Sequence, residues 1–192
     1  RRIGGLESVL VWDTEYYGKS IEWKAPANDV EDFFETGVAY NTSVAFSGGD
    51  DRTTYRMSYT NSSSEGYMPN SELNKNVLNL NASTKLGKKL TASAIINYTK
   101  QDALGRPVTG YDDNNLMQKF VQWGQRQLDM ERLEEYINPD GTQRTWNRLA
   151  WNDPTPRYSD NPYWTRYKNY TEDTRDRYYG NVGLVYDVND FL

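Results

Sequence analysis

The chain has 192 residues, a formal net charge of -5 and a mean hydropathy of -0.92. It contains neither cysteine nor histidine, which excludes disulfides, thiol nucleophiles, imidazole-based triads and the commonest zinc and haem ligands. The charge is spread without a basic run, so we expect no nucleic-acid partner. No run of about 20 apolar residues is present, and the sequence therefore predicts no membrane-spanning helix.

The aromatic content is high, with 16 Tyr and 6 Trp. Such side chains combine an apolar ring with a polar edge and are favoured at membrane interfaces and on carbohydrate-binding surfaces. The chain begins at Arg1 without an initiator methionine or signal-peptide core and stops at Leu192, just after a predicted strand. We expect an internal segment of a larger protein.

The strongest signal is alternation with a period of two, which places successive side chains on opposite faces of a strand. It predicts five strands, at about residues 38–47, 52–60, 76–84, 90–100 and 177–188. One face is apolar, and we expect these of its residues to face lipid: Tyr40, Val44, Phe46, Tyr55, Met57, Leu80, Ile96, Leu184 and Tyr186. The other face is small and polar, and we expect these of its residues to face a lumen: Asn41, Ser43, Arg56, Asn79, Asn97 and Asn181.

The connections between these strands alternate in length. Short ones are predicted at 48–51, 85–89 and 187–190, and long ones at 61–75 and 101–176. Outer-membrane barrels have tight periplasmic turns and long external loops, and this order is typical of them. A soluble antiparallel sandwich also alternates, but it has no reason to sort its loops by end.

The expected fold class is therefore all-β, as part of a large antiparallel transmembrane β-barrel in the cell outer membrane. Five strands cannot close around a lumen, so the barrel needs strands from outside this chain. Residues 1–36 are expected to form an external loop, and residues 37–192 to hold the five strands and the long external loop 101–176. Two alternatives stay open: a carbohydrate-binding β-sandwich module, and an outer-membrane barrel with a structural or assembly role.

Several stretches between residues 29 and 187 carry a more specific resemblance, and they occur in one order along the chain. They are DFFETG at 32–37, SGGD at 47–50, TTYRMSY at 53–59, EGYMPN at 65–70, QRQLD at 125–129, DNPYW at 160–164 and DR at 176–177 followed by Gly180. Together they resemble the SusC/RagA family of TonB-linked outer-membrane transporters.

The resemblance implies a parent protein with a 22-stranded barrel and an N-terminal plug domain, which is absent from this chain. It implies import of an oligosaccharide or a peptide, together with a SusD-like surface lipoprotein. Energy would come from TonB through the parent's N-terminal region, which this chain also lacks. Adjacent carboxylates such as Asp112-Asp113 and Glu134-Glu135 are more typical of solvated loops than of a glycosidase pair, so we expect no enzymatic activity, cofactor or metal.

The long loop 101–176 contains a predicted helix and an aromatic cluster. Asn114 is a candidate N-cap, followed at helical spacing by Leu116, Met117, Phe120, Val121 and Leu128, and residues 138–141 provide a stop. We expect residues 1–36 and 101–176 to pack against each other on an external rim. The candidates for contact with the partner or substrate are Trp146, Trp151, Tyr163 and Trp164. The alternative is that these rings only pack the loop on itself.

Overall fold

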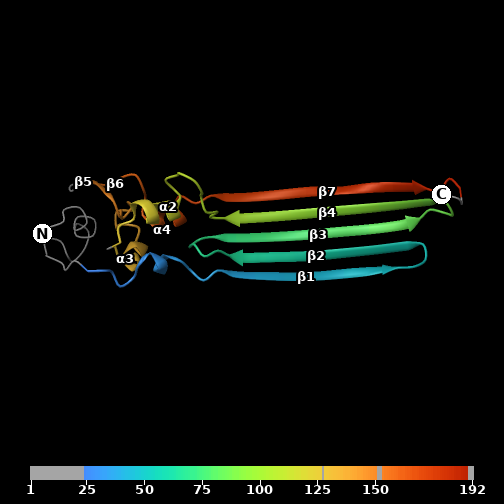
Figure 1. Cartoon of the computed structure of the whole chain (residues 1–192), viewed down its shortest axis with the longest axis horizontal. Helices are drawn as coiled ribbons and strands as arrows, with labels where there is room; N and C mark the ends of the chain where they lie inside the picture. Colours follow the sequence, from blue (N-terminus) through green and yellow to red (C-terminus); the bar gives the residue numbers. More distant parts are fainter. Residues whose placement is uncertain (1–23, 127, 151–152, 190–192) are drawn as a thin grey trace. The chain divides into compact units, whose positions relative to one another are not determined.

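The computed structural model describes residues 24–126, 128–150 and 153–189, and it divides the chain into two compact units (Figure 1). The sheet unit contains residues 38–65, 72–104 and those from 172 onward. The loop unit contains the residues up to 37 together with 66–71 and 105–171.

The sheet unit is a single antiparallel layer, which in the described part of the chain has five strands in the order β1-β2-β3-β4-β7 (Figure 1). Each strand pairs with its neighbours over its whole length. The strands are β1 (Val38–Gly49), β2 (Thr53–Glu65), β3 (Glu72–Lys85), β4 (Leu90–Leu104) and β7 (Glu172–Tyr186). The expectation of an all-β fold with five antiparallel strands is confirmed.

Short connections join the strands at one end of the sheet. Residues 50–52 join β1 to β2, and residues 86–89 join β3 to β4. In the first of these turns the Asp50 carboxylate accepts the backbone N–H groups of Arg52 at 2.8 Å and Thr53 at 2.7 Å. A short acidic side chain that bonds to the backbone two or three residues ahead favours a tight turn.

All five strands extend beyond a predicted limit, although β7 ends at Tyr186, before its predicted end at 188. β2 continues to Glu65 and β3 begins at Glu72, so the connection predicted at 61–75 shrinks to 66–71, and the long loop shrinks from 101–176 to 105–171. Most of the added residues are polar on both faces and carry no alternation; Leu73, Ala103 and Leu104 are apolar exceptions. Backbone pairing holds them, together with side-chain amides such as Asn61, which donates to Asn74 at 3.1 Å and to Asn76 at 2.9 Å.

The loop unit contains short helices and one small hairpin in its described residues. These elements are η1 (Val30–Phe33), a 3-10 helix; α2 (Leu116–Gln118); η2 (Lys119–Trp123), a π-helix; α3 (Met130–Glu134); β5 (Arg148–Ala150); β6 (Asp153–Pro156); and α4 (Pro162–Tyr167). In the described ranges, no helix has the length and apolar character needed to cross a membrane.

The single helix predicted from Asn114 is wrong in two respects. Its N-cap is Asn115, whose side chain accepts the backbone N–H of Gln118 at 3.3 Å. The helix ends at Trp123, because Gly124 has an extended backbone, and a separate helix starts after the N-cap Asp129. Helical spacing alone did not separate one helix from two.

The loop unit has a hydrophobic core of its own. The buried members are Phe33, Leu116, Phe120, Leu128, Met130, Leu133, Trp146 and Tyr163. Phe33 comes from the segment before β1, and its ring contacts those of Phe120 and Tyr163 with centroids 5.1 and 5.0 Å apart. For the described residues, the expected packing of the N-terminal segment on the long loop is confirmed.

Candidate functional site

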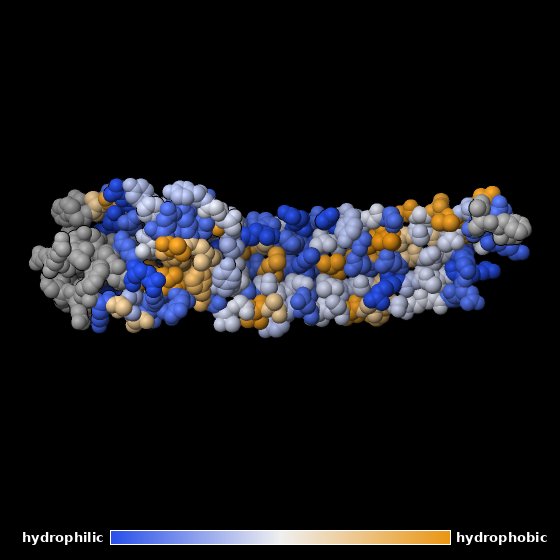
Figure 2. Space-filling view, in the orientation of Figure 1, coloured by the Kyte–Doolittle hydropathy of each residue, from blue (hydrophilic) through white to orange (hydrophobic). Residues whose placement is uncertain are grey.

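The strand register brings the apolar side chains together on one face of the sheet, which we call the apolar face. Directly paired residues of an antiparallel sheet share a face. One row runs Val44, Tyr59, Leu78, Tyr98 and Tyr178, and the next runs Phe46, Met57, Leu80, Ile96 and Gly180. All nine residues predicted to face lipid lie on this face. Most of its large side chains are exposed in the sheet unit, and Figure 2 shows hydrophobic surface over the strands.

Aromatic side chains border the apolar face at both ends of three strands. The bordering pairs are Tyr40 and Phe46 on β1, Tyr59 and Tyr55 on β2, and Tyr178 and Tyr186 on β7. Rings with a polar edge are favoured at the two boundaries of a membrane. The same arrangement flanks the apolar band of outer-membrane barrels.

The tyrosine hydroxyls at the end of the face opposite the short turns bond to polar residues beyond the apolar band. Tyr59 donates to Asn76 at 2.6 Å, and Tyr98 donates to Asp176 at 2.6 Å. The Tyr98 ring also stacks on Tyr178, with centroids 4.5 Å apart. Asn76 and Asp176 share the apolar face but lie one row further along the strands. Sequence reasoning missed these two partners. The available signal was a polar residue two positions beyond the last large apolar or aromatic residue of the strand, Leu78 on β3 and Tyr178 on β7.

The apolar band runs obliquely across the strands. The row that starts at Tyr40, the band's border on β1, reaches Thr174 on β7, four positions before the border residue Tyr178. The row that starts at Phe46 reaches Gly180, six positions before the other border residue, Tyr186. Between β1 and β7 both borders therefore shift in the same direction. At the Tyr178 border the whole shift falls between β1 and β2, because Tyr59, Leu78, Tyr98 and Tyr178 share one row.

The size of this shift gives an angle. Four to six positions correspond to about 14–20 Å along a strand, and four strand spacings to about 19 Å across the sheet. Averaged from β1 to β7, the band is therefore inclined by about 35–45° to the rows of paired residues. Strands of a membrane barrel are tilted by about 35–45° from the barrel axis. The rows of paired residues are perpendicular to the strands, and the membrane plane is perpendicular to the barrel axis. The membrane plane therefore crosses these rows at the same angle of about 35–45°.

The height of the band can be compared with a bilayer in the same way. On β7 the apolar stretch from Tyr178 to Tyr186 spans about 27 Å along the strand. At a tilt of about 40° this projects to about 21 Å, close to the apolar band of about 25 Å in outer-membrane barrels. The stretches on β2 and β3 are shorter.

The opposite face of the sheet, which we call the polar face, carries all six residues predicted to face a lumen: Asn41, Ser43, Arg56, Asn79, Asn97 and Asn181. Neighbouring strands are linked on it by Ser43 with Thr60 at 2.9 Å and by Asn79 with Ser58 at 3.4 Å. Val77, Ile95 and Val185 are apolar exceptions on this face.

The residues predicted to contact a partner or substrate have different environments. Trp146 and Tyr163 belong to the loop unit's core and are buried, so they have little surface for another molecule. Trp164 is half-buried, and its ring lies edge-on to Tyr136. Trp151 lies outside the described residues. For Trp146 and Tyr163, the structure shows the alternative given above, in which the rings pack the loop on itself.

Within the described part of the chain, no group of three or more acidic side chains is arranged to hold a metal ion. No protein-family model matches the chain, and a search of curated proteins finds no significant match. The functional assignment therefore depends on the two faces of the sheet and on the sequence resemblance to SusC/RagA transporters.

Proposed function

We propose that this chain is part of a transmembrane β-barrel of the outer membrane that imports a nutrient. The observation that carries this proposal is the oblique apolar band of the sheet. It lies on one face, it is bordered by aromatic rings, and its mean inclination of about 35–45° between β1 and β7 is that of tilted barrel strands. The polar face would then line the lumen, with Arg56 and the asparagines in contact with water.

A soluble β-sandwich accounts for less of this geometry. In a sandwich the apolar face packs against a second sheet about 10 Å away, and its core has no need of hydroxyl-bearing rings along both borders. The sheet unit also has polar strand ends that extend past the band, as barrel strands do when they project beyond the bilayer. These features favour lipid as the medium that covers Val44, Ile96 and Leu184.

The transport part of the proposal comes from the sequence resemblance. A member of the SusC/RagA type would import an oligosaccharide or a peptide, with a SusD-like lipoprotein at the surface and TonB acting through another part of the full-length protein. We propose no catalytic role, because the carboxylates in the described residues are spread over strands, helices and loops.

The faces are tested by matched arginine substitutions in the full-length protein. Val44 and Ser43 are neighbours on β1 and point to opposite faces. An arginine facing lipid near the midplane costs about 2–4 kcal/mol in a barrel. Val44→Arg should therefore lower the yield of folded protein in outer membranes, measured by the heat-dependent shift of a folded barrel on gels, and Ser43→Arg should not. Ile96→Arg and Asn97→Arg on β4 repeat the comparison.

Equal yields within both pairs would overturn the membrane assignment. Import is tested separately by deleting the gene for the full-length protein and restoring it, with growth measured on mixed oligosaccharides and on mixed peptides. Growth that depends on the gene on either mixture supports import. Identical growth with and without the gene, on both mixtures, contradicts import and favours the structural or assembly role.

A further inference from the structure

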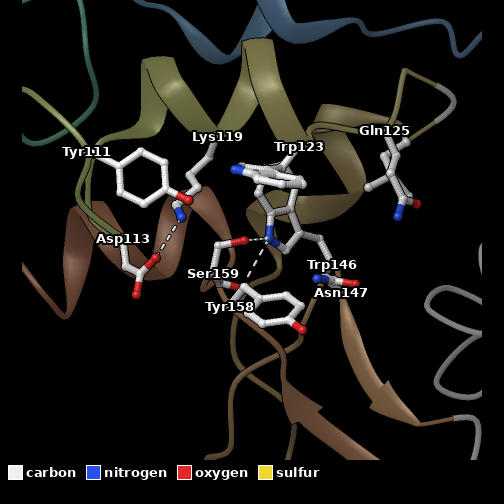
Figure 3. Close-up of a pocket in the computed structure, with 10 residues that line it drawn as sticks. Tyr111, Asp113, Lys119, Trp123, Gln125, Trp146, Asn147, Tyr158 and Ser159 are labelled. Atoms are coloured by element: carbon white, nitrogen blue, oxygen red, sulfur yellow. Dashed lines mark hydrogen bonds and ion pairs between the residues drawn. The ribbon is translucent and has the colours of Figure 1, made fainter.

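The loop unit contains a cavity of about 460 Å³ that the functions above do not use (Figure 3). Pockets for small ligands typically have volumes of about 300–1,000 Å³. Its walls come from η2, from the segment before α2, and from the two segments that flank the β5–β6 hairpin, which contain Trp146 and Tyr158. The residues used in the argument are Asp113, Lys119, Trp123, Gln125, Trp146 and Tyr158.

The π-helix η2 supplies one wall of the cavity. Lys119 and Trp123 are its first and last residues, and both line the cavity. Single π-turns within helices occur frequently at functional sites. Lys119 is only 4% exposed, and its ammonium lies 2.7 Å from an Asp113 oxygen. Figure 3 shows this pair pointing toward each other beside the aromatic rings.

Tyr158 supplies an aromatic ring to another wall of the cavity, and its backbone is strained. Its φ of 66° lies in the left-handed region, which a bulky residue rarely adopts, and such strain clusters at binding sites. The strain does not serve burial, because the side chain is 72% exposed. The Arg157 guanidinium lies 4.9 Å from the ring centroid and donates to the Tyr158 hydroxyl at 3.0 Å, which holds the ring in place.

The remaining wall combines a buried ring with an unpaired acceptor. The Trp146 indole N–H donates to Ser159 at 3.3 Å, which fixes this ring in the wall. The buried Gln125 Oε1 accepts no hydrogen bond from any described residue. A buried polar atom without a partner is costly, and a ligand hydroxyl that donates to it would remove this cost.

We propose that this cavity binds a pyranose unit of an uncharged oligosaccharide. A sugar ring has an apolar face of C–H groups that packs on an aromatic ring, and hydroxyls that both donate and accept hydrogen bonds. Trp123 and Tyr158 offer exposed rings, Asp113 and Gln125 offer acceptors, and Lys119 offers donors. This inference rests on the proposed import function, because it assigns the imported nutrient as an oligosaccharide and not a peptide.

Other ligands fit the cavity less well. A phosphate or carboxylate would need a free cation, and the Lys119 ammonium is already neutralised by Asp113. A peptide bound by strand addition needs regularly spaced backbone groups along a free strand edge, whereas side chains form the walls here. An uncharged ligand with mixed donors and acceptors matches the neutral Lys119–Asp113 pair.

The test is binding to the purified full-length protein in detergent, by isothermal titration calorimetry. The probes are hexasaccharides of α-linked glucose, β-linked glucose, mannose, galactose and xylose, together with a hexapeptide mixture. The host's own lipopolysaccharide is a further probe, because its core sugars offer the same chemistry from the membrane side. Trp123→Ala and Tyr158→Ala should each weaken saccharide binding by about tenfold, as expected when one stacked ring is lost.

Two further variants separate binding from folding. Asp113→Asn keeps an oxygen that can accept from Lys119 but removes the charge that neutralises this buried ammonium, and it should weaken binding several-fold. Tyr170→Ala removes an exposed ring that does not line the cavity and should leave the affinity unchanged. Binding of a free hexasaccharide that depends on Trp123 supports a nutrient site, and binding of lipopolysaccharide alone with the same dependence supports a site for surface sugars.

No saccharide binding, unchanged affinity in Trp123→Ala, or peptide binding that depends on Trp123 would overturn the proposal. This failure is distinguishable from failure of the proposed function. Gene-dependent growth on oligosaccharides with unaltered binding in the cavity variants leaves import standing and removes the site. If the protein does not assemble in membranes but binds a saccharide in a way that depends on Trp123, the site stands and the proposed import function fails.

Discussion

Asn70 and Arg166 each bind the backbone of the other through their side chains. Asn70 Nδ2 donates to the Arg166 carbonyl at 2.7 Å, and Arg166 Nη2 donates to the Asn70 carbonyl at 3.1 Å. The same guanidinium donates to the carbonyls of Pro69 at 2.7 Å and Gly105 at 2.5 Å. Arg166 is 4% exposed, and burial lowers the pKa of its guanidinium. One side chain thus ties α4 to two other segments of the loop unit.

Arg166→Lys is expected to loosen α4. A lysine ammonium cannot reproduce the planar fork of guanidinium donors, so at least one buried carbonyl loses its partner, at a cost of about 1–3 kcal/mol. Hydrogen exchange in the full-length protein should show a fall of this size in the opening free energy of the Lys168 amide. Arg126→Lys alters an exposed ion pair with Asp29 and should change the opening free energy of the Lys168 amide by less than about 1 kcal/mol. Equal exchange in both variants would contradict the role given to Arg166.

Asn161→Asp is expected to destabilise the loop unit. Asn161 is fully buried, and its Nδ2 donates to the carbonyls of Leu133 at 3.0 Å and Arg144 at 2.9 Å. Aspartate keeps the cap of α4 but loses both donors and faces these carbonyls with a charge, at a cost of about 2–4 kcal/mol. The variant should be cut faster by trypsin at pH 7 than the wild type, whereas Asn114→Asp, at an exposed position, should not.

The sign of the pH effect gives a second check on Asn161→Asp. Burial beside carbonyls should raise the pKa of the new carboxyl above its unfolded value. The variant's deficit should therefore be smallest below the unfolded pKa and should grow as pH rises through the raised value. Protease resistance measured with an acid-active protease near pH 4 should accordingly approach that of the wild type. A deficit independent of pH would indicate that the lost donors, and not the buried charge, cause the destabilisation.

Gly180→Ala and Gly183→Ala are expected to differ, although both lie on β7. A Cβ at Gly180 would lie 2.1 Å from the Ile95 carbonyl oxygen, so β7 would have to shift against β4, at a cost of about 1–3 kcal/mol. At Gly183 the nearest atom is the Ser93 Oγ at 2.8 Å, which can rotate away. Alanine there should be neutral or slightly stabilising. The measurement is the urea midpoint of the folded protein on gels, and a midpoint for Gly180→Ala at or above the wild type would contradict the close approach.

The β1–β2 turn is expected to weaken at acid pH. The backbone N–H groups of Thr53 and Arg52 hold the pKa of Asp50 below its usual value. A carboxyl with a depressed folded pKa contributes stability above its unfolded pKa of 3.8, and this contribution is lost as pH falls through the folded value. Protection of the Thr53 amide from exchange, normalised for intrinsic rates, should therefore fall below about pH 4. In Asp50→Asn, whose amide oxygen still accepts, protection should not change with pH.

Local patterns in the sequence determined the strands and their two faces. Alternation along β1, β2, β3, β4 and β7 separated apolar from polar residues, because a strand's side chains alternate regardless of what lies beside it. The same reasoning stopped short at the strand ends. Asn61 and Asn74 lie outside the predicted strands, and backbone pairing with a neighbouring strand places them in the sheet.

Only the tertiary structure decided the features that depend on register and on contacts distant in sequence. The inclination of the apolar band requires knowing that Tyr40 shares a row with Thr174, a relation that passes through three intervening strands. The core of the loop unit joins Phe33 to Tyr163, and its cavity joins Lys119 to Tyr158. Local propensity carries no information on such pairs, because their contact arises only when the whole chain has closed around them.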